Sequence, residues 1–213
     1  MSSIRRWQCD ECASIPFPSP RWSPGPLKEL DAGSVVDLLD DLDSKLARRG
    51  TAASLYVVGG SAMLLAHGRS IATPDVDIAR TVDVATCAAE EIARERGLSM
   101  KWLNSAAAPW IPPRPDCALR LASRPGATVH LAPPRHLLAM KLVAWRPKDE
   151  DDLADLLIAC DLAQATAEEV SAVLFELYTA EDSLPGLLGI PRSDAEATRL
   201  EAIARARDAL TLL

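Results

Sequence analysis

The first regular hydrophobic pattern in the chain begins near residue 34 and has the period of an amphipathic helix. Ser34 is suited to cap the start of this helix and Gly50 to end it. Three aspartates, Asp40, Asp41 and Asp43, fall largely on the opposite face, where we expect solvent. The apolar positions that define the pattern are Val35, Val36, Leu38, Leu39, Leu42 and Leu46.

The next stretch alternates short β-prone runs with helical segments. Residues 54–58 form an apolar, β-prone run, and a Gly-Gly-Ser turn follows at residues 59–61 before a short apolar helix at 62–66. Further elements are a strand at 75–79, a helix at 83–96 closed by Gly97, a loop rich in Pro and Ala at 102–115, and paired strands at 117–122 and 127–131.

Beyond residue 132 the pattern is helical throughout. Pro133 and Pro134 open one helix and Pro147 ends it. A second helix is predicted at 149–162, and two more begin with the capping boxes Thr166/Glu169 and Ser193/Glu196. The order of elements predicts an α+β fold, with a mixed sheet flanked by helices and a helical C-terminal region. The expected parts are a proline-rich arm (1–26), an α+β core (27–132) and a helical region packed on the core (133–213).

Composition narrows the possible classes of protein. With 213 residues, 48% of them hydrophobic, the chain is long enough to bury a core. The net charge of −7 argues against nonspecific coating of nucleic acid, which needs a concentrated positive field. No apolar stretch is long enough to span a membrane and no secretory signal is recognisable, so we expect no membrane association and a cytoplasmic location. The pair Cys9 and Cys12 has the spacing of metal ligands, but no second close pair accompanies it, which leaves zinc or redox chemistry and a flexible leader as alternatives.

Most candidate binding and catalytic residues lie in the stretch GGSAMLLAHGRSIATPDVDIA, where thirteen residues separate Ser61 from Asp75. Side chains alternate along a strand, so Asp75 and Asp77 emerge on one face and their carboxylates can converge on one cation. Oxygen ligands of this kind suit Mg²⁺. A Gly-Gly-Ser turn at the start of a helix presents amide groups to an anion. Together these features predict a site for a nucleoside triphosphate and Mg²⁺. The alternative interpretation of the two acids is a charged edge strand.

This stretch resembles the signature of the nucleotidyltransferase superfamily, which is an apolar strand, Gly-Ser, a spacer and then Asp-apolar-Asp. Together with HLLAMKLVAWRPKDEDDLADL it is similar to the toxin branch related to the AbiEii and MenT proteins, from toxin-antitoxin operons. The two blocks cover about a quarter of the chain. The resemblance implies a nucleotidyltransferase-like sheet.

The resemblance also implies roles for single residues. Gly60 and Ser61 would hold the triphosphate, and Asp75 and Asp77 would be catalytic residues that hold Mg²⁺. Lys141 would contact the nucleotide, with a surface lysine as the alternative. A further functional acid is implied in RPKDEDDL, where Asp149 and Asp152 both fit and Asp152 is favoured.

Other positions near these motifs leave alternatives open. Arg69 can bind a phosphate or brace its loop, as can Thr73. The superfamily often has a third acid on the next core strand, for which Asp116 is the nearest candidate. The cations of the middle of the chain suggest an RNA or triphosphate channel. They are Arg114, Arg120, Arg124, Arg135, Lys141, Arg146 and Lys148.

By resemblance, the expected function is a toxin that transfers a nucleotide from a nucleoside triphosphate to the 3′ end of tRNA. Such a transfer would block aminoacylation, and a cognate antitoxin protein would be a partner. Two alternatives remain: an enzyme that modifies an aminoglycoside or lincosamide antibiotic, and a noncatalytic nucleotide-binding or antitoxin-type module.

Overall fold

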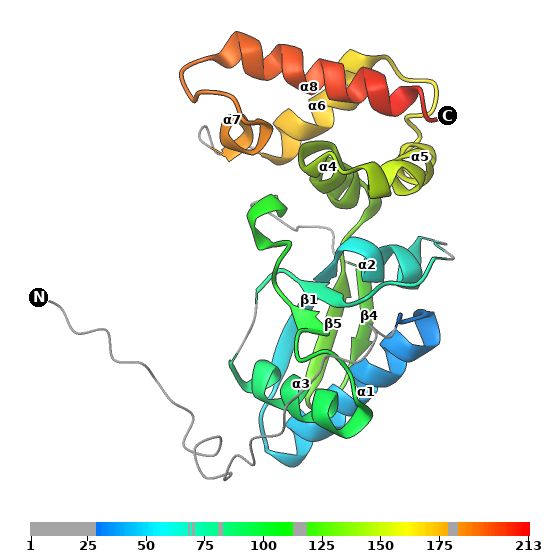
Figure 1. The fold of residues 1–213 in the computed structure, drawn as a ribbon, viewed down its shortest axis with the longest axis vertical. Coiled ribbons are helices and arrows are strands. Elements are labelled where there is room, and N and C mark those ends of the chain that lie inside the picture. Colours follow the sequence, from blue (N-terminus) through cyan, green and yellow to red (C-terminus); the bar gives the residue numbers. More distant parts are fainter. Residues whose placement is uncertain (1–28, 68, 70, 81–82, 113–118, 179–182) are drawn as a thin grey trace, which may run out of the picture.

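A mixed five-stranded sheet forms the centre of the part of the chain that the structure describes (Figure 1). The structure is a computed structural model and describes residues 29–67, 69, 71–80, 83–112, 119–178 and 183–213. The strand order is β3-β2-β1-β5-β4. β1 runs antiparallel to β2 and parallel to β5, and β4 is antiparallel to β5. The strands are β1 (Ala53–Val58), β2 (Val76–Ile78), β3 (Leu103–Asn104), β4 (Leu119–Ser123) and β5 (Ala127–Leu131).

Helices flank this sheet and also make up the C-terminal part, so the α+β class predicted from the order of elements is confirmed in its coarse form. In Figure 1, α1 and α3 lie beside the sheet, and α4 to α8 gather beyond one end of it. The helices are α1 (Ala32–Arg48), α2 (Gly59–Ala66), α3 (Asp83–Arg96), α4 (Pro134–Ala144), α5 (Glu150–Ala159), α6 (Ala167–Leu177), α7 (Ser183–Leu188) and α8 (Ala195–Leu210), with short 3₁₀ turns η1 (Ala108–Trp110) and η2 (Pro147–Asp149). The predicted arm 1–26, the cysteine pair and Asp116 lie outside the described residues.

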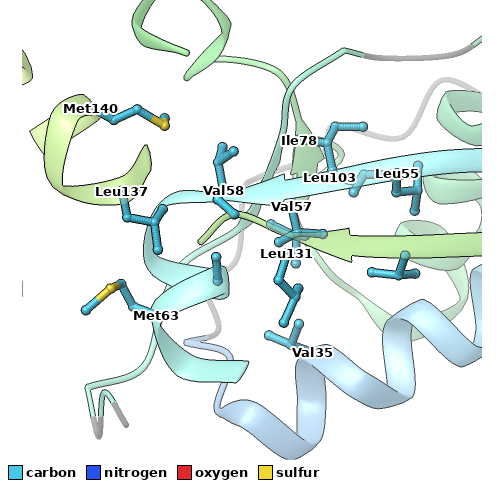
Figure 2. Close-up of a cluster of buried hydrophobic side chains, with 14 of the residues drawn as sticks. Val35, Leu55, Val57, Val58, Met63, Ile78, Leu103, Leu131, Leu137 and Met140 are labelled. Carbon is cyan, nitrogen blue, oxygen red and sulfur yellow. The ribbon is translucent and has the colours of Figure 1, made fainter. Parts of the chain in front are cut away.

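The alternation along the strands separates a buried face of the sheet from a more open one. On β1, Leu55 and Val57 are fully buried, whereas Ser54 is exposed and Tyr56 only partly buried. Figure 2 shows Val57 on the side of the sheet toward Val35 of α1. The open face is the one that carries Asp77, because its neighbours in β2 are both buried.

The helical C-terminal region contacts the sheet where β1 ends. Val58, the last residue of β1, points toward Leu137 and Met140 of α4 (Figure 2). Nearby, the hydroxyl of Tyr56 and Nδ1 of His136, also on α4, form a hydrogen bond of 3.1 Å. The start of α4 is therefore fixed beside the point where the chain leaves β1 and enters α2.

Several local predictions need correction. The N-cap of the first helix is Asp31, three residues before Ser34, because the Asp31 side chain accepts a hydrogen bond from the amide of Ser34, and the helix begins at Ala32. At the C-terminal end of the chain, the cap of α8 is Asp194 rather than Ser193. The capping box of Thr166 and Glu169 is confirmed, since both of its hydrogen bonds are present.

The prediction that Asp43 lies in solvent is wrong. Its side chain is buried, and one carboxylate oxygen accepts hydrogen bonds from the amides of Gly126 and Ala127, at 2.8 and 2.9 Å. Gly126 lies in the turn between β4 and β5, and Ala127 is the first residue of β5. A buried carboxylate is stable when it accepts such bonds, and Asp43 therefore joins α1 to the β4–β5 hairpin.

Among the described residues, no helix combines the length and the apolar character that crossing a membrane requires.

Candidate functional site

Asp77, the second acid of the Asp-Val-Asp motif, lies directly against the glycine turn. Asp77 in β2 is paired with Val58, and Gly59 follows Val58 as the first residue of α2. A Cβ atom built on Gly59 would lie 3.0 Å from Oδ2 of Asp77. Gly59 also has a φ angle of +64°, a left-handed conformation that favours glycine. Glycine at this position thus meets two requirements: a sharp exit from the strand, and room for the carboxylate.

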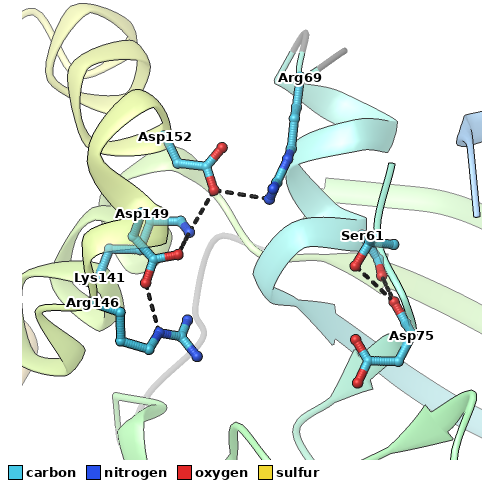
Figure 3. Close-up of polar contacts among 8 residues, drawn as sticks. Ser61, Arg69, Asp75, Lys141, Arg146, Asp149 and Asp152 are labelled. Carbon is cyan, nitrogen blue, oxygen red and sulfur yellow. Dashed lines mark hydrogen bonds and ion pairs between the residues drawn. The ribbon is translucent and has the colours of Figure 1, made fainter. Parts of the chain in front are cut away.

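The Ser61 side chain is buried and holds the backbone of Asp75, so its hydroxyl does not face the open side of the sheet. Its side chain is 1% exposed, and Oγ donates a hydrogen bond of 2.7 Å to the backbone carbonyl of Asp75 (Figure 3). Oγ1 of Thr73 donates to the same carbonyl at 3.2 Å. In this structure the Ser61 hydroxyl is thus engaged in holding the loop before β2. Its expected contact with a triphosphate would require that bond to break.

Asn104 of β3 completes the immediate surroundings of the acids. It pairs with Asp77 across the β2–β3 ladder, and its Nδ2 donates to Oδ2 of Asp75 at 2.9 Å. Its Oδ1 accepts from the amide of Ala106 at 2.7 Å, which fixes the orientation of the side chain. The Pro- and Ala-rich composition of segment 102–115 predicts a loop, so no pattern in the sequence points to Asn104.

The ionised form of Asp77 is electrostatically unfavourable in this structure. Burial and the neighbouring charge of Asp75 raise the pKa of Asp77 to about 6, although Arg146, Lys148 and a hydrogen bond from the Ala107 amide act in the opposite direction. The raised pKa means that the ionised form is poorly satisfied in the protein alone. The cations Arg146 and Lys148 come from the connection between α4 and α5, so this connection lies within electrostatic reach of the acids.

The donor set fits a hard divalent cation. Two carboxylates on one face, one with a raised pKa, are a combination that an oxygen-preferring ion such as Mg²⁺ relieves. Within the described ranges, no group of three or more His, Cys, Asp or Glu side chains is placed to hold a metal. An ion bound here would have Asp75 and Asp77 as its carboxylate ligands, with the side-chain amide of Asn104 hydrogen-bonded to Asp75 beside them.

Lys141 and Asp152, also expected at the site, belong to a buried ion network beside it (Figure 3). Lys141 is 4% exposed, so the alternative of a surface lysine is wrong. Its Nζ donates to Oδ1 of Asp149 at 2.8 Å and to Oδ2 of Asp152 at 2.7 Å. Both candidate acids of the RPKDEDDL motif are thus buried and bound to the same lysine. Burial by itself raises the pKa of Asp149, but the charges and hydrogen bonds of Lys141 and Arg146 outweigh it and lower that pKa.

Arg69 connects this network to the glycine turn. Its guanidinium donates to Oδ2 of Asp152 at 2.9 Å, and the same guanidinium nitrogen would lie 2.9 Å from a Cβ on Gly60. Among the described residues, Nε of Arg69 has no hydrogen-bond partner although it is buried. Arg69 therefore lies over the start of α2 while its charge is paired with α5. This position is compatible with both earlier alternatives, bracing the loop and binding a phosphate.

The network extends to Arg146, whose Nε donates to Oδ2 of Asp149 at 2.7 Å. Sequence reasoning placed Arg146 and Lys148 in a general group of cations and gave them no role at the acids. In the structure, both cations lower the pKa of Asp77, and this effect distinguishes them from the rest of the group. The signal that could have found them is their position between Lys141 and Asp152, the two motif residues of the second block.

No family model, curated protein or solved structure matches this chain. The function of the site therefore has to be inferred from its own chemistry. That chemistry consists of two adjacent carboxylates, a glycine turn that touches one of them, and three cations, Arg69, Arg146 and Lys148, placed around the turn and the acids.

The contact between Gly59 and Asp77 leads to a prediction with a matched control. Gly59 and Gly50 both have left-handed φ angles, but a Cβ on Gly50 would meet nothing within 4 Å. We expect Gly59→Ala and Gly50→Ala to lose about 1–2 kcal/mol of stability each through backbone strain. Only Gly59→Ala should weaken Mg²⁺ binding, because its methyl group displaces the Asp77 carboxylate. Urea unfolding and titration with Mg²⁺ measure the two effects. Equal Mg²⁺ affinity in both variants would contradict the assigned contact.

Proposed function

We propose that this protein is a Mg²⁺-dependent nucleotidyltransferase with a nucleotidyltransferase-like fold, and that it acts as a toxin by adding a nucleotide to the 3′ end of tRNA. The observation that supports the chemistry best is the contact of Asp77 with the Gly59 turn, beside Asp75 and within reach of Arg146 and Lys148. Carboxylates for a metal and amides for an anion then lie side by side, as transfer from a nucleoside triphosphate requires.

Each group has a role in this proposal. Asp75 and Asp77 would hold Mg²⁺, and Asn104 would keep the Asp75 carboxylate oriented through its hydrogen bond of 2.9 Å. When bound, Mg²⁺ supplies Lewis-acid chemistry, since it neutralises charge on the triphosphate oxygens. The amides at Gly59 and Gly60 and the side chain of Arg69 would contact phosphate oxygens at the start of α2.

The reaction is an in-line displacement at the α-phosphorus. The terminal hydroxyl of the acceptor forms the new oxygen–phosphorus bond, its proton passes to solvent, and the bond to pyrophosphate breaks. Arg146 and Lys148 would bind the charge that gathers on the transferred group and on pyrophosphate. The residues of this site therefore contribute by positioning and electrostatic stabilisation, with no covalent intermediate on the protein.

The acceptor rests on the resemblance to the toxin branch of the superfamily. Addition of a nucleotide to the 3′ end of tRNA would remove the hydroxyl that is aminoacylated, and translation would stop. A protein of this kind requires a partner that restrains it, so we also propose a cognate antitoxin protein and action in the cytoplasm.

The experiment combines the purified protein with total tRNA, Mg²⁺ and each of the four labelled nucleoside triphosphates. We expect label to enter tRNA at its 3′ end with at least one nucleotide. Asp75→Ala should reduce incorporation at least 100-fold, because it removes one of the two carboxylates for the metal. Failure with all four nucleotides, or equal incorporation by the variant, would refute the proposal.

Two parallel assays distinguish the alternative functions. Incorporation into an aminoglycoside or lincosamide, with resistance instead of growth arrest on expression, would indicate an antibiotic-modifying enzyme. Triphosphate binding without any transfer, and a cellular effect that survives the replacement of both Asp75 and Asp77, would indicate a noncatalytic module.

A further inference from the structure

Trp145 has a backbone conformation that large side chains rarely adopt. It caps the C-terminus of α4 with φ 46° and ψ 58°, in the left-handed region, and its amide donates to the carbonyl of Lys141 at 2.9 Å. Glycine is the usual residue at such a cap, since a side chain adds strain. A strained position occupied by the largest aromatic residue is a feature that often accompanies a binding function.

The chain on both sides of Trp145 is anchored, so the strained conformation is held in place. Before it, NH1 of Arg205 donates to the carbonyls of Leu142 and Val143, at 3.1 and 2.7 Å. After it, Arg146 bonds to the buried Asp149. These contacts fix the backbone of the α4–η2 connection independently of the indole ring. Trp145 is 37% exposed.

Hydrogen bonds join the same connection to the glycine turn, because Arg146 bonds to Asp149, Lys141 joins Asp149 to Asp152, and Arg69 joins Asp152 to the start of α2. Arg146 and Lys148 both act electrostatically on Asp77. Within four residues the chain thus presents an exposed aromatic ring and two cations next to the proposed Mg²⁺ and triphosphate site. Aromatic rings bind nucleobases by stacking, and neighbouring cations bind phosphates, so this combination has the composition of a nucleotide-binding segment.

We infer that Trp145 is the platform on which the base of the incoming nucleoside triphosphate stacks, while Arg146 and Lys148 contact its phosphates. The inference rests on the proposed function and adds a base-binding residue to it. Stacking on a flat ring tolerates all bases, since each has a π face. The four nucleotides should therefore depend on Trp145 to similar extents.

The test compares Trp145→Gly and Trp145→Phe in equilibrium binding by calorimetry with ATP, GTP, CTP and UTP in the presence of Mg²⁺. Trp145→Gly should weaken binding of the nucleotides at least fivefold, and Trp145→Phe should stay within about threefold of the original protein. Inorganic tripolyphosphate, which has no base, should bind all three proteins equally. The circular-dichroism spectrum of Trp145→Gly should match that of the original protein, because glycine accepts the left-handed conformation and the Arg205 bonds hold the end of α4. This last result excludes misfolding as the cause of weaker binding.

The outcomes separate this inference from the proposed function. If the original protein binds no nucleotide, the proposed function fails and the inference fails with it. If it binds nucleotides and Trp145→Gly binds them equally well, only the inference is wrong. A loss of tRNA affinity with unchanged nucleotide affinity would also overturn it, since the ring would then stack on the acceptor. Ile158→Ala, which removes an exposed apolar side chain from α5, is the matched control and should leave all affinities unchanged.

Discussion

Lys141→Ala is expected to destabilise the protein by about 3–5 kcal/mol at pH 7, because it removes the cation shared by two buried carboxylates. Lys141 Nζ lies 2.8 Å from Asp149 and 2.7 Å from Asp152, and all three side chains are almost fully buried. Arg69 and Arg146 each reach only one of the two acids, so neither can replace the lysine. Urea unfolding at pH 7 measures the loss.

The pH dependence of this loss gives a second test of the same network. In the original protein the pKa of Asp149 is lowered, so the ionised carboxylate contributes stability above its unfolded pKa and this stability is lost as the pH falls. Without Lys141 that contribution is missing, so the difference from the original protein should shrink as the pH falls below the unfolded pKa of 3.8. The exposed Arg207→Ala on α8 serves as control and should cost less than about 0.5 kcal/mol. A loss as small as that control's at pH 7 would rule out a structural role for Lys141.

Asp77→Asn is expected to stabilise the protein in the absence of divalent cations, on the order of 3 kcal/mol at pH 8. The pKa of Asp77 is raised from 3.8 to about 6, so the folded state binds the proton more tightly than the unfolded state. The stability of the original protein therefore falls as the pH rises from about 4 to about 6, and above that the penalty is complete. Asparagine carries no charge and avoids this penalty, so the advantage of the variant should disappear near pH 4.

Addition of Mg²⁺ should reverse the order of stability at pH 8. In the proposed function the ion binds the folded original protein and stabilises it by mass action, whereas the variant would have lost one carboxylate and would gain less. Thermal unfolding in a buffer with EDTA and in one with about 10 mM Mg²⁺ measures both effects. Asp155→Asn, at an exposed position of α5, is the control and should behave like the original protein in both buffers. Equal stability of Asp77→Asn and the original protein at every pH would show that Asp77 lacks the assigned environment.

The sequence predicted best those features that depend on neighbours in the chain. Periodicity placed β5 at its observed bounds and α3 within about a residue of them, and the motif has Asp77 lying against Gly59. A strand, a glycine turn and a returning antiparallel strand are local events, so their geometry follows from residues within about two dozen positions. The choice of these residues as a candidate site needed no tertiary information.

The features that could not be predicted from the sequence depend on contacts between residues far apart in the chain. The burial of Asp43 is decided by the amides of Gly126 and Ala127, far along the chain. Asn104 lies beside the acids because the two-residue strand β3 pairs with β2. The Pro- and Ala-rich composition of 102–115 does not predict this pairing. The burial of Lys141 follows from the packing of α4 against α5 and likewise has no local pattern.

The position of β1 in the middle of the sheet also constrains the order in which the protein assembles. β1 acquires its antiparallel neighbour β2 after a short excursion of the chain, but its parallel neighbour β5 begins only at Ala127, which pairs with Ala53. Closing so long a loop has an entropic cost that is repaid only when the pairing forms, and such pairing is slow. During synthesis on the ribosome, one edge of β1 therefore stays without its partner until residue 131 has emerged, and the hydrogen-bonding groups along it are open to other chains for that interval.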